Sequence, residues 1–376
     1  MAPLLHLPVF RNQDAVMINM DRVSHVSYNR RDKTLTALEG TKFQAVYDVA
    51  YKAGRELTLG WCPCVGVAGA SMGGGHGRLQ GKYGLSADAI VKFRMVLGDG
   101  AILETSASEN TDLSWVMRDA GHNFSLVVET TFKTWSQQKD GTINKLFPID
   151  PAVAIDLLIL DDPETLQPIV TLDVVYAGPL KKDSNLLTNF ITRTSLSESL
   201  VPWNQVNVVS AGGSAGPARV DGPATNLYSF SAAHLDIATT LELFKSDVTF
   251  VKNGPQASAS MLLWEIPGVQ AVLAQPEDRS AVGNRRFAAV LGAIEAIYTN
   301  DSVARAADAR AMSWRDQLAA PRSSGHDKEY CYVNSAHNDE SRESIYGYEL
   351  WRLQRLRELQ RRHDPRRFFN GFHSFH

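Results

Sequence analysis

The sequence predicts an α+β fold, because strands and helices occupy separate stretches of the chain. Two β-rich runs joined by Gly98-Asp99-Gly100 are typical of a hairpin, and a second hairpin is expected around a turn at 29–32. Helices of about four turns are expected over residues 237–252 and 285–299. Strands and helices do not alternate at regular βαβ spacing, which disfavours a doubly wound parallel sheet.

The first third of the chain predicts a strand, a hairpin and a helix in turn. Residues 15–20 are an apolar run that favours a strand, and residues 42–57 place Phe43, Val46 and Val49 at helical spacing. Gly54 suits the end of that helix. After a glycine-rich stretch at 61–89 and the hairpin, we expect a helix over 109–121 and a strand over 123–135.

The pattern of expected strands, helices and loops changes near residue 140 and again near residue 330. Strands are expected at 171–179 and 258–268, and residues 208–226 are a loop rich in Gly, Pro and Ala. A short strand is expected at 330–338. Leucines at 350, 353, 356 and 359 then mark one face of a helix that Pro365 stops. We therefore expect two units, residues 1–140 with 328–376, and residues 141–327.

Composition restricts the classes of partner. The chain has 376 residues, 44% of them hydrophobic, and a formal net charge of −3, so no basic field favours nucleic acid. No apolar run reaches the roughly 18 residues of a membrane span. The first residues lack the basic segment of a signal peptide, so a cytoplasmic location is expected.

Three cysteines cannot form a disulfide framework. Cys62 and Cys64 are separated only by Pro63, which is poor spacing for a bridge. A zinc site is also excluded, because His76 is the only further ligand nearby and structural zinc requires a second pair. Cys331 is expected to be a buried apolar side chain, and for Cys64 the same interpretation stays open beside a functional one.

The glycine-rich stretch fits neither common phosphate loop. The dinucleotide pattern G-x-G-x-x-G does not occur between a strand and a helix, and "GRLQGKY" has one residue too few for a P-loop. Successive backbone N–H groups in a glycine turn can still bind an anion such as a pyrophosphate. Gly73, Gly74, Gly75 and Gly77 are the candidates, and a tight turn without a ligand is the alternative.

Longer motifs carry a family resemblance. "GxCPxVGVxGxxxGGGHGxLxxKYGLxxD", then a hairpin, then "DLxWxxRxAGxNF", and at the end "YCYVNSAHNDE" and "RLRELQRRHDPRRFFN", occur in this order. Together they resemble the berberine-bridge-enzyme-like branch of the vanillyl-alcohol-oxidase flavoproteins, closely over about residues 16–135 and 328–372. The resemblance implies a PCMH-type FAD-binding domain, formed by residues 1–140 and 328–376. It also implies a substrate domain over 141–327, with an antiparallel sheet and flanking helices.

The resemblance also implies roles for particular residues. Cys62 matches the cysteine that bonds the isoalloxazine ring in bicovalent members, so FAD bound covalently through Cys62 is expected. Gly60 belongs to the same loop, and Val127 and Val128 would contact the cofactor through backbone atoms. The implied cofactor-binding residues are Cys62, Val65, Gly66, Gly69, Gly73, Gly74, Gly75, His76, Gly77, Val127, Val128 and Asn334.

The match to the family pattern is incomplete. A unit that normally precedes residue 15 and carries the histidine of a second covalent bond is expected to be shortened here, and His6 does not replace that histidine. A shortened gene model would produce the same beginning. Asp119 and Ser125 replace two glycines of the pattern, and Ser335 replaces a tyrosine. Each added side chain would crowd a close backbone approach, and Asp119 would repel a nearby phosphate.

Two functions remain open at this point. The first is an FAD-linked oxidase of a small organic substrate, in which a base takes a proton, hydride passes to the flavin and dioxygen reoxidises it. Tyr332 is the first candidate base and would need a lowered pKa, and Glu265 is the second. Alternatively, Tyr332 is a half-buried strand residue, and Glu265 is a wall carboxylate paired with Arg285 or Arg286.

His234 is interpreted as a satisfied core histidine. The second function is a flavin-free descendant that binds a metabolite or catalyses a redox-neutral cyclisation or isomerisation by proximity. No metal site is expected in either case.

Overall fold

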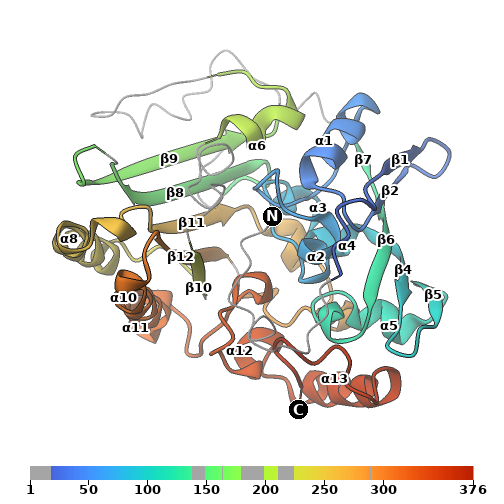
Figure 1. Ribbon diagram of the computed structural model, residues 1–376. Helices are drawn as coiled ribbons and strands as arrows, with labels where there is room; N and C mark the ends of the chain where they lie inside the picture. Colours follow the sequence, from blue (N-terminus) through green and yellow to red (C-terminus); the bar gives the residue numbers. More distant parts are fainter. Residues whose placement is uncertain are drawn as a thin grey trace.

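Two five-stranded antiparallel sheets organise the computed structural model, which describes residues 18–137, 149–162, 164–178, 199–210, 224–287 and 289–375 (Figure 1). His6 lies outside these ranges, as does most of the loop expected at 208–226. None of the described helices is both long and apolar enough to cross a lipid bilayer.

The first sheet contains both predicted hairpins. Its strand order is β1 (Val26–Asn29), β2 (Thr34–Leu38), β6 (Leu126–Lys133), β4 (Ile90–Val96) and β5 (Ile102–Ser106). Helices α1 (Phe43–Lys52), α5 (Thr111–Val116) and α13 (Leu350–His363) contribute to one hydrophobic core with this sheet. The hairpins and these three helices confirm the corresponding predictions.

The second sheet has the order β10 (Ala224–Ala232), β12 (Val290–Tyr298), β11 (Met261–Pro267), β8 (Val153–Asp161) and β9 (Pro168–Tyr176). Helices α8 (Ile237–Asn253) and α10 (Asp301–Ala319) pack against one of its faces, around Trp264 and Ile294 (Figure 1). Strands β9 and β11 and helix α8 confirm predictions, whereas β8 and α10 were not predicted.

The shorter elements connect these layers. They are β3 (Arg55–Glu56) paired with β7 (Trp135–Ser136), and the helices α2 (Val67–Met72), α3 (Gln80–Tyr83), α4 (Ser86–Ala89), α6 (Val206–Val209), α9 (Gln270–Leu273), α11 (Pro321–Ser324) and α12 (Arg342–Tyr346).

The helix expected over 285–299 is wrong, because residues 290–298 form the strand β12 between β10 and β11. A short apolar run does not distinguish a buried strand from a buried helix. The packing of Gly292 shows why this segment is a strand in the sheet. A Cβ there would lie 2.2 Å from the Phe230 ring of the neighbouring strand, so the pair fits only with glycine.

Two other strand predictions are also wrong. Residues 18–20, the described part of the strand expected at 15–20, lie outside any strand. Residues 333–335 form a single 3-10 turn, and no strand is assigned over 330–338. In the segment 330–338, Cys331 and Val333 are buried although they are not part of a β-ladder.

The face of the second sheet opposite α8 and α10 carries acidic residues. Asp173, Asp156 and Glu265 lie in direct register across β9, β8 and β11. Their neighbours along each strand, such as Trp264, point into the helical core, and side chains alternate along a strand. Because Arg78 of the first unit contacts Asp156, this acidic face is turned toward the glycine-rich stretch.

Candidate active site

The Cys-Pro-Cys segment is a β-turn mounted on the beginning of α1. The Val65 amide donates to the Cys62 carbonyl at 3.3 Å, with Pro63 at the second position of the turn. The amides of Phe43 and Gln44, which have no partner within their own helix, donate to the carbonyls of Val65 and Pro63. The helix therefore holds the shape of the turn.

This turn brings Cys62 and Cys64 closer together than their spacing in the sequence suggests, although no disulfide joins them. In an extended chain, side chains two residues apart lie on one face but far from each other. The turn at Pro63 instead brings the two sulfur atoms to 2.7 Å from one another. Both cysteines are half-buried, so the alternative of a fully buried Cys64 is not supported.

The four central glycines pack against the protein itself. Gly74 and Gly75 have positive φ angles of 100° and 75°, a conformation that favours glycine. A Cβ on Gly73 would lie 2.0 Å from the Asn334 side chain, and one on Gly77 would lie 2.0 Å from the Leu59 carbonyl. Glycine is required here for close packing.

The N–H groups of these four glycines all donate within the chain. Gly73 and Gly74 donate to the carbonyls of residues 69 and 71, Gly75 to the Tyr332 hydroxyl, and Gly77 to the Gln80 side chain. A phosphate site at Gly73, Gly74, Gly75 and Gly77 therefore has no open donor among these four amides, in contrast to the sequence-based expectation.

Gly66 and Gly69 differ from the central glycines. No heavy atom lies within 4 Å of a Cβ built on either residue, and Gly69 is exposed. Cys62 and Val65 beside them are half-buried. These four residues, Cys62, Val65, Gly66 and Gly69, line what we call the open strip, along which a flat group can approach the backbone.

Tyr332 lies beneath the central glycines. Its hydroxyl accepts from the Gly75 amide at 3.1 Å and from the Asn334 side-chain amide at 2.5 Å, and Asn334 also donates to the Ala70 carbonyl. Burial raises the pKa of Tyr332 well above its usual range, although these hydrogen bonds act in the opposite direction. The lowered pKa that a tyrosine base requires is therefore contradicted.

Glu265 has the electrostatics of a general base. Burial is the main cause that raises its pKa to about 8, and the neighbouring charges of Asp156, Glu295 and Cys62 raise it further. The residue as a whole is half-buried on the acidic face. A carboxyl with this pKa exchanges protons near neutral pH.

The partners suggested for Glu265 are wrong. Arg285 makes a bidentate ion pair with Asp88, at 2.7 and 2.8 Å, and Arg286 pairs with Glu277. The positive charge of Arg78 lowers the pKa of Glu265 and so offsets part of the rise that burial and the like charges cause.

Sequence reasoning missed Glu295 and Arg78. Burial raises the pKa of Glu295 to about 7, and the Cys62 sulfur adds to this rise. Arg78 is almost fully buried, donates to Asp156 at 2.9 Å and to Asn207 at 3.0 Å, and lies over the Trp61 ring. The strand that carries Glu295 was predicted as a helix, which concealed the alternation that places it on the acidic face.

His76 is a neutral, buried imidazole. Its ring contacts the Tyr332 ring edge-on at 4.6 Å between centroids. Gln80 Oε1 accepts from the Gly77 amide and lies 3.0 Å from His76 Nδ1, so Nδ1 carries the proton. Burial lowers the pKa of His76 to about 4, and its Nε2 atom is buried without a hydrogen-bond partner.

Other predicted positions have structural roles. Asp119 adopts a positive φ of 121°, where the family pattern has glycine, and accepts from the Gly283 amide. Ser125 donates to the Met117 sulfur. The Val127 side chain is buried in the first core and the Val128 carbonyl accepts from the Glu39 amide. His234 is exposed, so its interpretation as a core histidine is wrong.

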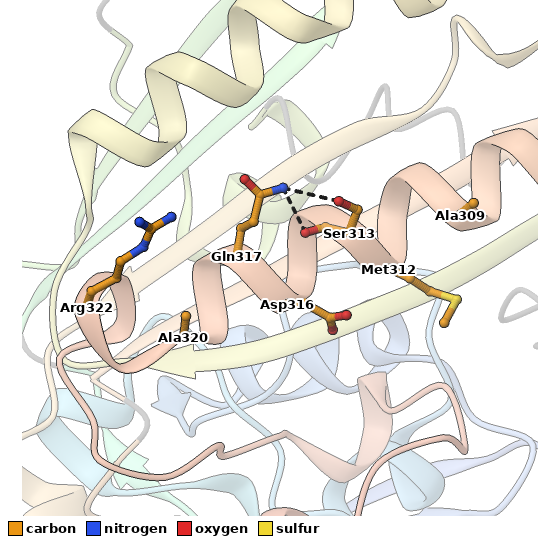
Figure 2. Close-up of a pocket in the computed structure, with 7 residues that line it drawn as sticks. All are labelled: Ala309, Met312, Ser313, Asp316, Gln317, Ala320 and Arg322. Carbon is orange, nitrogen blue, oxygen red and sulfur yellow. Dashed lines mark hydrogen bonds between the residues drawn. The ribbon is translucent and has the colours of Figure 1, made fainter.

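A separate surface depression lies along α10 and α11 (Figure 2). Its lining includes Met312, Ser313, Asp316, Gln317 and Arg322, all from these two helices. Gln317 donates its amide to the Ser313 hydroxyl and carbonyl. None of the predicted site residues lines it, and the described residues hold no group of three His, Cys, Asp or Glu arranged for a metal.

Comparisons with known proteins agree on a cofactor. A family model described as an FAD binding domain matches residues 5–106. The chain is 27% identical to the FAD-linked oxidoreductase srdI of Neurospora crassa, covering 96% of this chain and 75% of that protein. It is 29% identical to the FAD-linked oxidoreductase OXR1 of Pyricularia oryzae, with the same coverage of both chains.

Solved structures share the fold. The wild-type BBE-like 1 protein of Physcomitrella patens superposes with a TM-score of 0.72 at 20% identity, covering 95% of this chain and 79% of that one. A glucooligosaccharide oxidase of Acremonium strictum superposes with a TM-score of 0.71 at 16% identity, covering 96% and 81%. That oxidase carries a 6-S-cysteinyl, 8α-N1-histidyl FAD.

Proposed function

Because this chain belongs to the berberine-bridge-enzyme-like, PCMH-type family of FAD-linked oxidoreductases, we propose that it oxidises a small organic substrate with Glu265 as the general base. The observation that carries the proposal is the meeting of three segments distant in sequence. Arg78 lies over the ring of Trp61, which precedes Cys62, and pairs with Asp156, which is in register with Glu265. Tyr332 accepts from the Gly75 amide, so the glycine-rich stretch meets both β11 and the C-terminal segment.

FAD is the cofactor of this family, and the open strip fits it. Gly66 and Gly69 leave free space beside the backbone, and Cys62 stands next to that space with its sulfur half-buried. Cys62 would hold the cofactor covalently, as the 6-S-cysteinyl bond of the glucooligosaccharide oxidase suggests. When bound, FAD supplies the hydride acceptor, its N5 atom, and passes both electrons to dioxygen.

The protein supplies the proton transfer and the positioning. Glu265 removes the proton from a substrate alcohol while hydride leaves the carbon that bears it, or from a phenol while hydride leaves a side-chain carbon conjugated with the ring, and the carboxyl then carries that proton. Tyr332 is held by Gly75 and Asn334 and stays protonated, so it orients groups in the site and does not remove protons. Residues 1–140 with 328–376 would bind the cofactor, and 141–327 the substrate.

A secondary metabolite is the proposed substrate class. Relatives at 27–29% identity are fungal FAD-linked oxidoreductases, and the acidic face beside Glu265 is lined by groups that can accept hydrogen bonds from hydroxyls. The proposed partners are therefore that small molecule and dioxygen.

Two measurements test the proposal. The purified protein should show flavin absorbance, and after acid precipitation the colour should stay with the tryptic peptide 56–78, which contains Cys62, but leave the Cys62→Ala variant. The Glu265→Gln variant should lower the rate of flavin reduction in a single turnover by about 10²–10⁴-fold. Glu277→Gln is the matched control, since Glu277 pairs with Arg286 away from the site. A colourless protein, or an unchanged rate for Glu265→Gln, would overturn it.

A further inference from the structure

A second thiol lies beside the proposed attachment point, and the chemistry above does not use it. The sulfur atoms of Cys62 and Cys64 are 2.7 Å apart, closer than the roughly 3.5–4.0 Å at which non-bonded heavy atoms usually rest. A disulfide requires about 2.05 Å. The turn therefore holds the two sulfurs between contact and bonding.

We propose that Cys62 and Cys64 form a dithiol–disulfide couple that exchanges with small-molecule disulfides and controls whether Cys62 is available to the cofactor. The couple depends only on the geometry of the turn. The control of attachment rests on the proposed function of Cys62.

The backbone turn already places the two cysteine side chains next to each other. Pro63 restricts the turn, the amide of Val65 closes it on the carbonyl of Cys62, and α1 holds it through two further hydrogen bonds. Closing the bridge therefore costs little additional conformational entropy. A segment of the same sequence in a strand would have to break its ladder first.

Access separates this pair from the remaining cysteine. Cys62 and Cys64 are half-buried, so a small disulfide can reach them. Cys331 is 3% exposed, and burial raises the pKa of its thiol well above the usual range, so it forms little of the reactive thiolate. Cys331 is thus an internal control for reactivity.

The exchange balances without a further reactant. One protein thiolate attacks a sulfur of the external disulfide, which breaks and releases one thiolate, and a mixed disulfide forms. The second protein thiolate then displaces the other half. One bond has formed between Cys62 and Cys64, the external disulfide has taken two electrons, and the two protein thiol protons go to the two released thiolates.

The experiment uses the full chain and oxidised glutathione. Protein produced without bound flavin is incubated with the oxidant, alkylated in the native state and digested with trypsin, so that residues 56–78 carry both cysteines on one peptide. We expect this peptide to be two hydrogen masses lighter than the dithiol form, without alkyl or glutathionyl groups. Dithiothreitol should restore two alkylation sites. The Cys64→Ser variant should stop at a glutathionyl adduct on Cys62, and Cys331→Ser should behave as the parent protein.

Wild-type protein that stays a dithiol, or that accumulates adducts without closing the bridge, would overturn the couple. In a second arm, reduced and oxidised samples receive FAD and are precipitated with acid. Colour should remain only with the reduced protein, and equal colour in both samples would overturn the control of attachment. If neither sample retains colour, the covalent role of Cys62 fails, whereas the peptide mass alone still decides whether the couple exists.

Discussion

At the residue scale, two acidic side chains have raised pKa values because the fold surrounds them with protein and with like charges. The pKa of Glu265 is raised to about 8 and that of Glu295 to about 7, burial being the largest cause in both. Tyr332 is shifted in the same direction, which makes it a poorer base. The division of roles between Glu265 and Tyr332 follows from this contrast.

The raised pKa of Glu265 makes a prediction about stability. Between about pH 4.5, the ordinary value for glutamate, and about pH 8, the folded protein binds a proton that the unfolded chain has lost. This contribution is therefore fully present below pH 4.5 and is lost as the pH rises through 8. Urea unfolding of flavin-free Glu265→Gln and wild-type protein should diverge in favour of the variant across this range. A constant difference between the two would contradict the raised pKa.

Tyr332→Phe should affect stability more than proton transfer. The change leaves the Gly75 amide and the Asn334 side chain without their common acceptor, which costs about 1–3 kcal/mol for buried donors. The midpoint of the pH–rate profile should stay near the pKa of Glu265. Denaturant unfolding measures the first effect and single-turnover kinetics the second. A profile whose midpoint moves would return Tyr332 to the role of base.

At the scale of elements, the glycines divide into two groups with different duties. The central glycines, such as Gly73 and Gly77, allow other parts of the protein to pack closely against the loop backbone. Gly66 and Gly69 at the beginning of α2 have no protein atom within 4 Å of a built Cβ, so the space beside them forms part of the open strip. The glycine-rich stretch therefore contains glycines that allow close packing and glycines that leave a surface open to a ligand.

Gly69→Ala tests this division. The residue lies inside α2 with no neighbour within 4 Å of its Cβ, so alanine should leave stability unchanged or raise it by up to about 1 kcal/mol. The same methyl group would occupy the open strip and should weaken FAD binding at least tenfold, measured by calorimetry in the Cys62→Ala background, where FAD binds without a covalent bond. Gly73→Ala is the contrasting variant and should destabilise the fold. Unchanged affinity in Gly69→Ala would move the cofactor elsewhere.

At the scale of the whole molecule, the site exists because the acidic face of the second sheet meets the glycine-rich stretch of the first unit. Arg78 makes this junction through Asp156, Asn207 and Ser210, and all of these side chains are buried. The charged network lies between the cysteine turn and Glu265. It therefore positions the two halves of the site relative to each other.

Breaking this junction on one side should be costly. Arg78→Met leaves the Asp156 carboxylate buried without its cation, and the expected loss is about 3–5 kcal/mol in the free energy of unfolding. The double variant Arg78→Met, Asp156→Leu should recover much of that loss, because it removes both charges. Chemical denaturation of the two single variants and the double variant measures the coupling. Additive effects would show that the pair does not act as a unit.

Local pattern was sufficient for much of the fold. Hairpins at 26–38 and 90–106, helices α1, α8 and α13, and the strand β11 that carries Glu265 were predicted from spacing and turn residues. The sequence also proposed Cys62, Glu265, Tyr332 and Asn334 as site residues, and their roles stay predictions. Periodicity and motif order are local properties, and they survive in the folded chain wherever tertiary contacts agree with them.

Tertiary structure alone decided the rest. Whether residues 290–298 became a strand depended on two flanking strands and on the space beside Gly292, neither of which is local. The proposed choice of Glu265 as base rests on burial and neighbouring charge, which raise the pKa values of Glu265 and Tyr332 alike but bring only that of the carboxyl near neutral pH. The distance between Cys62 and Cys64 depended on a turn that α1 holds in place. Sequence by itself determined which residues are present, and the long-range packing determined their protonation and their contacts, because both depend on groups distant along the chain.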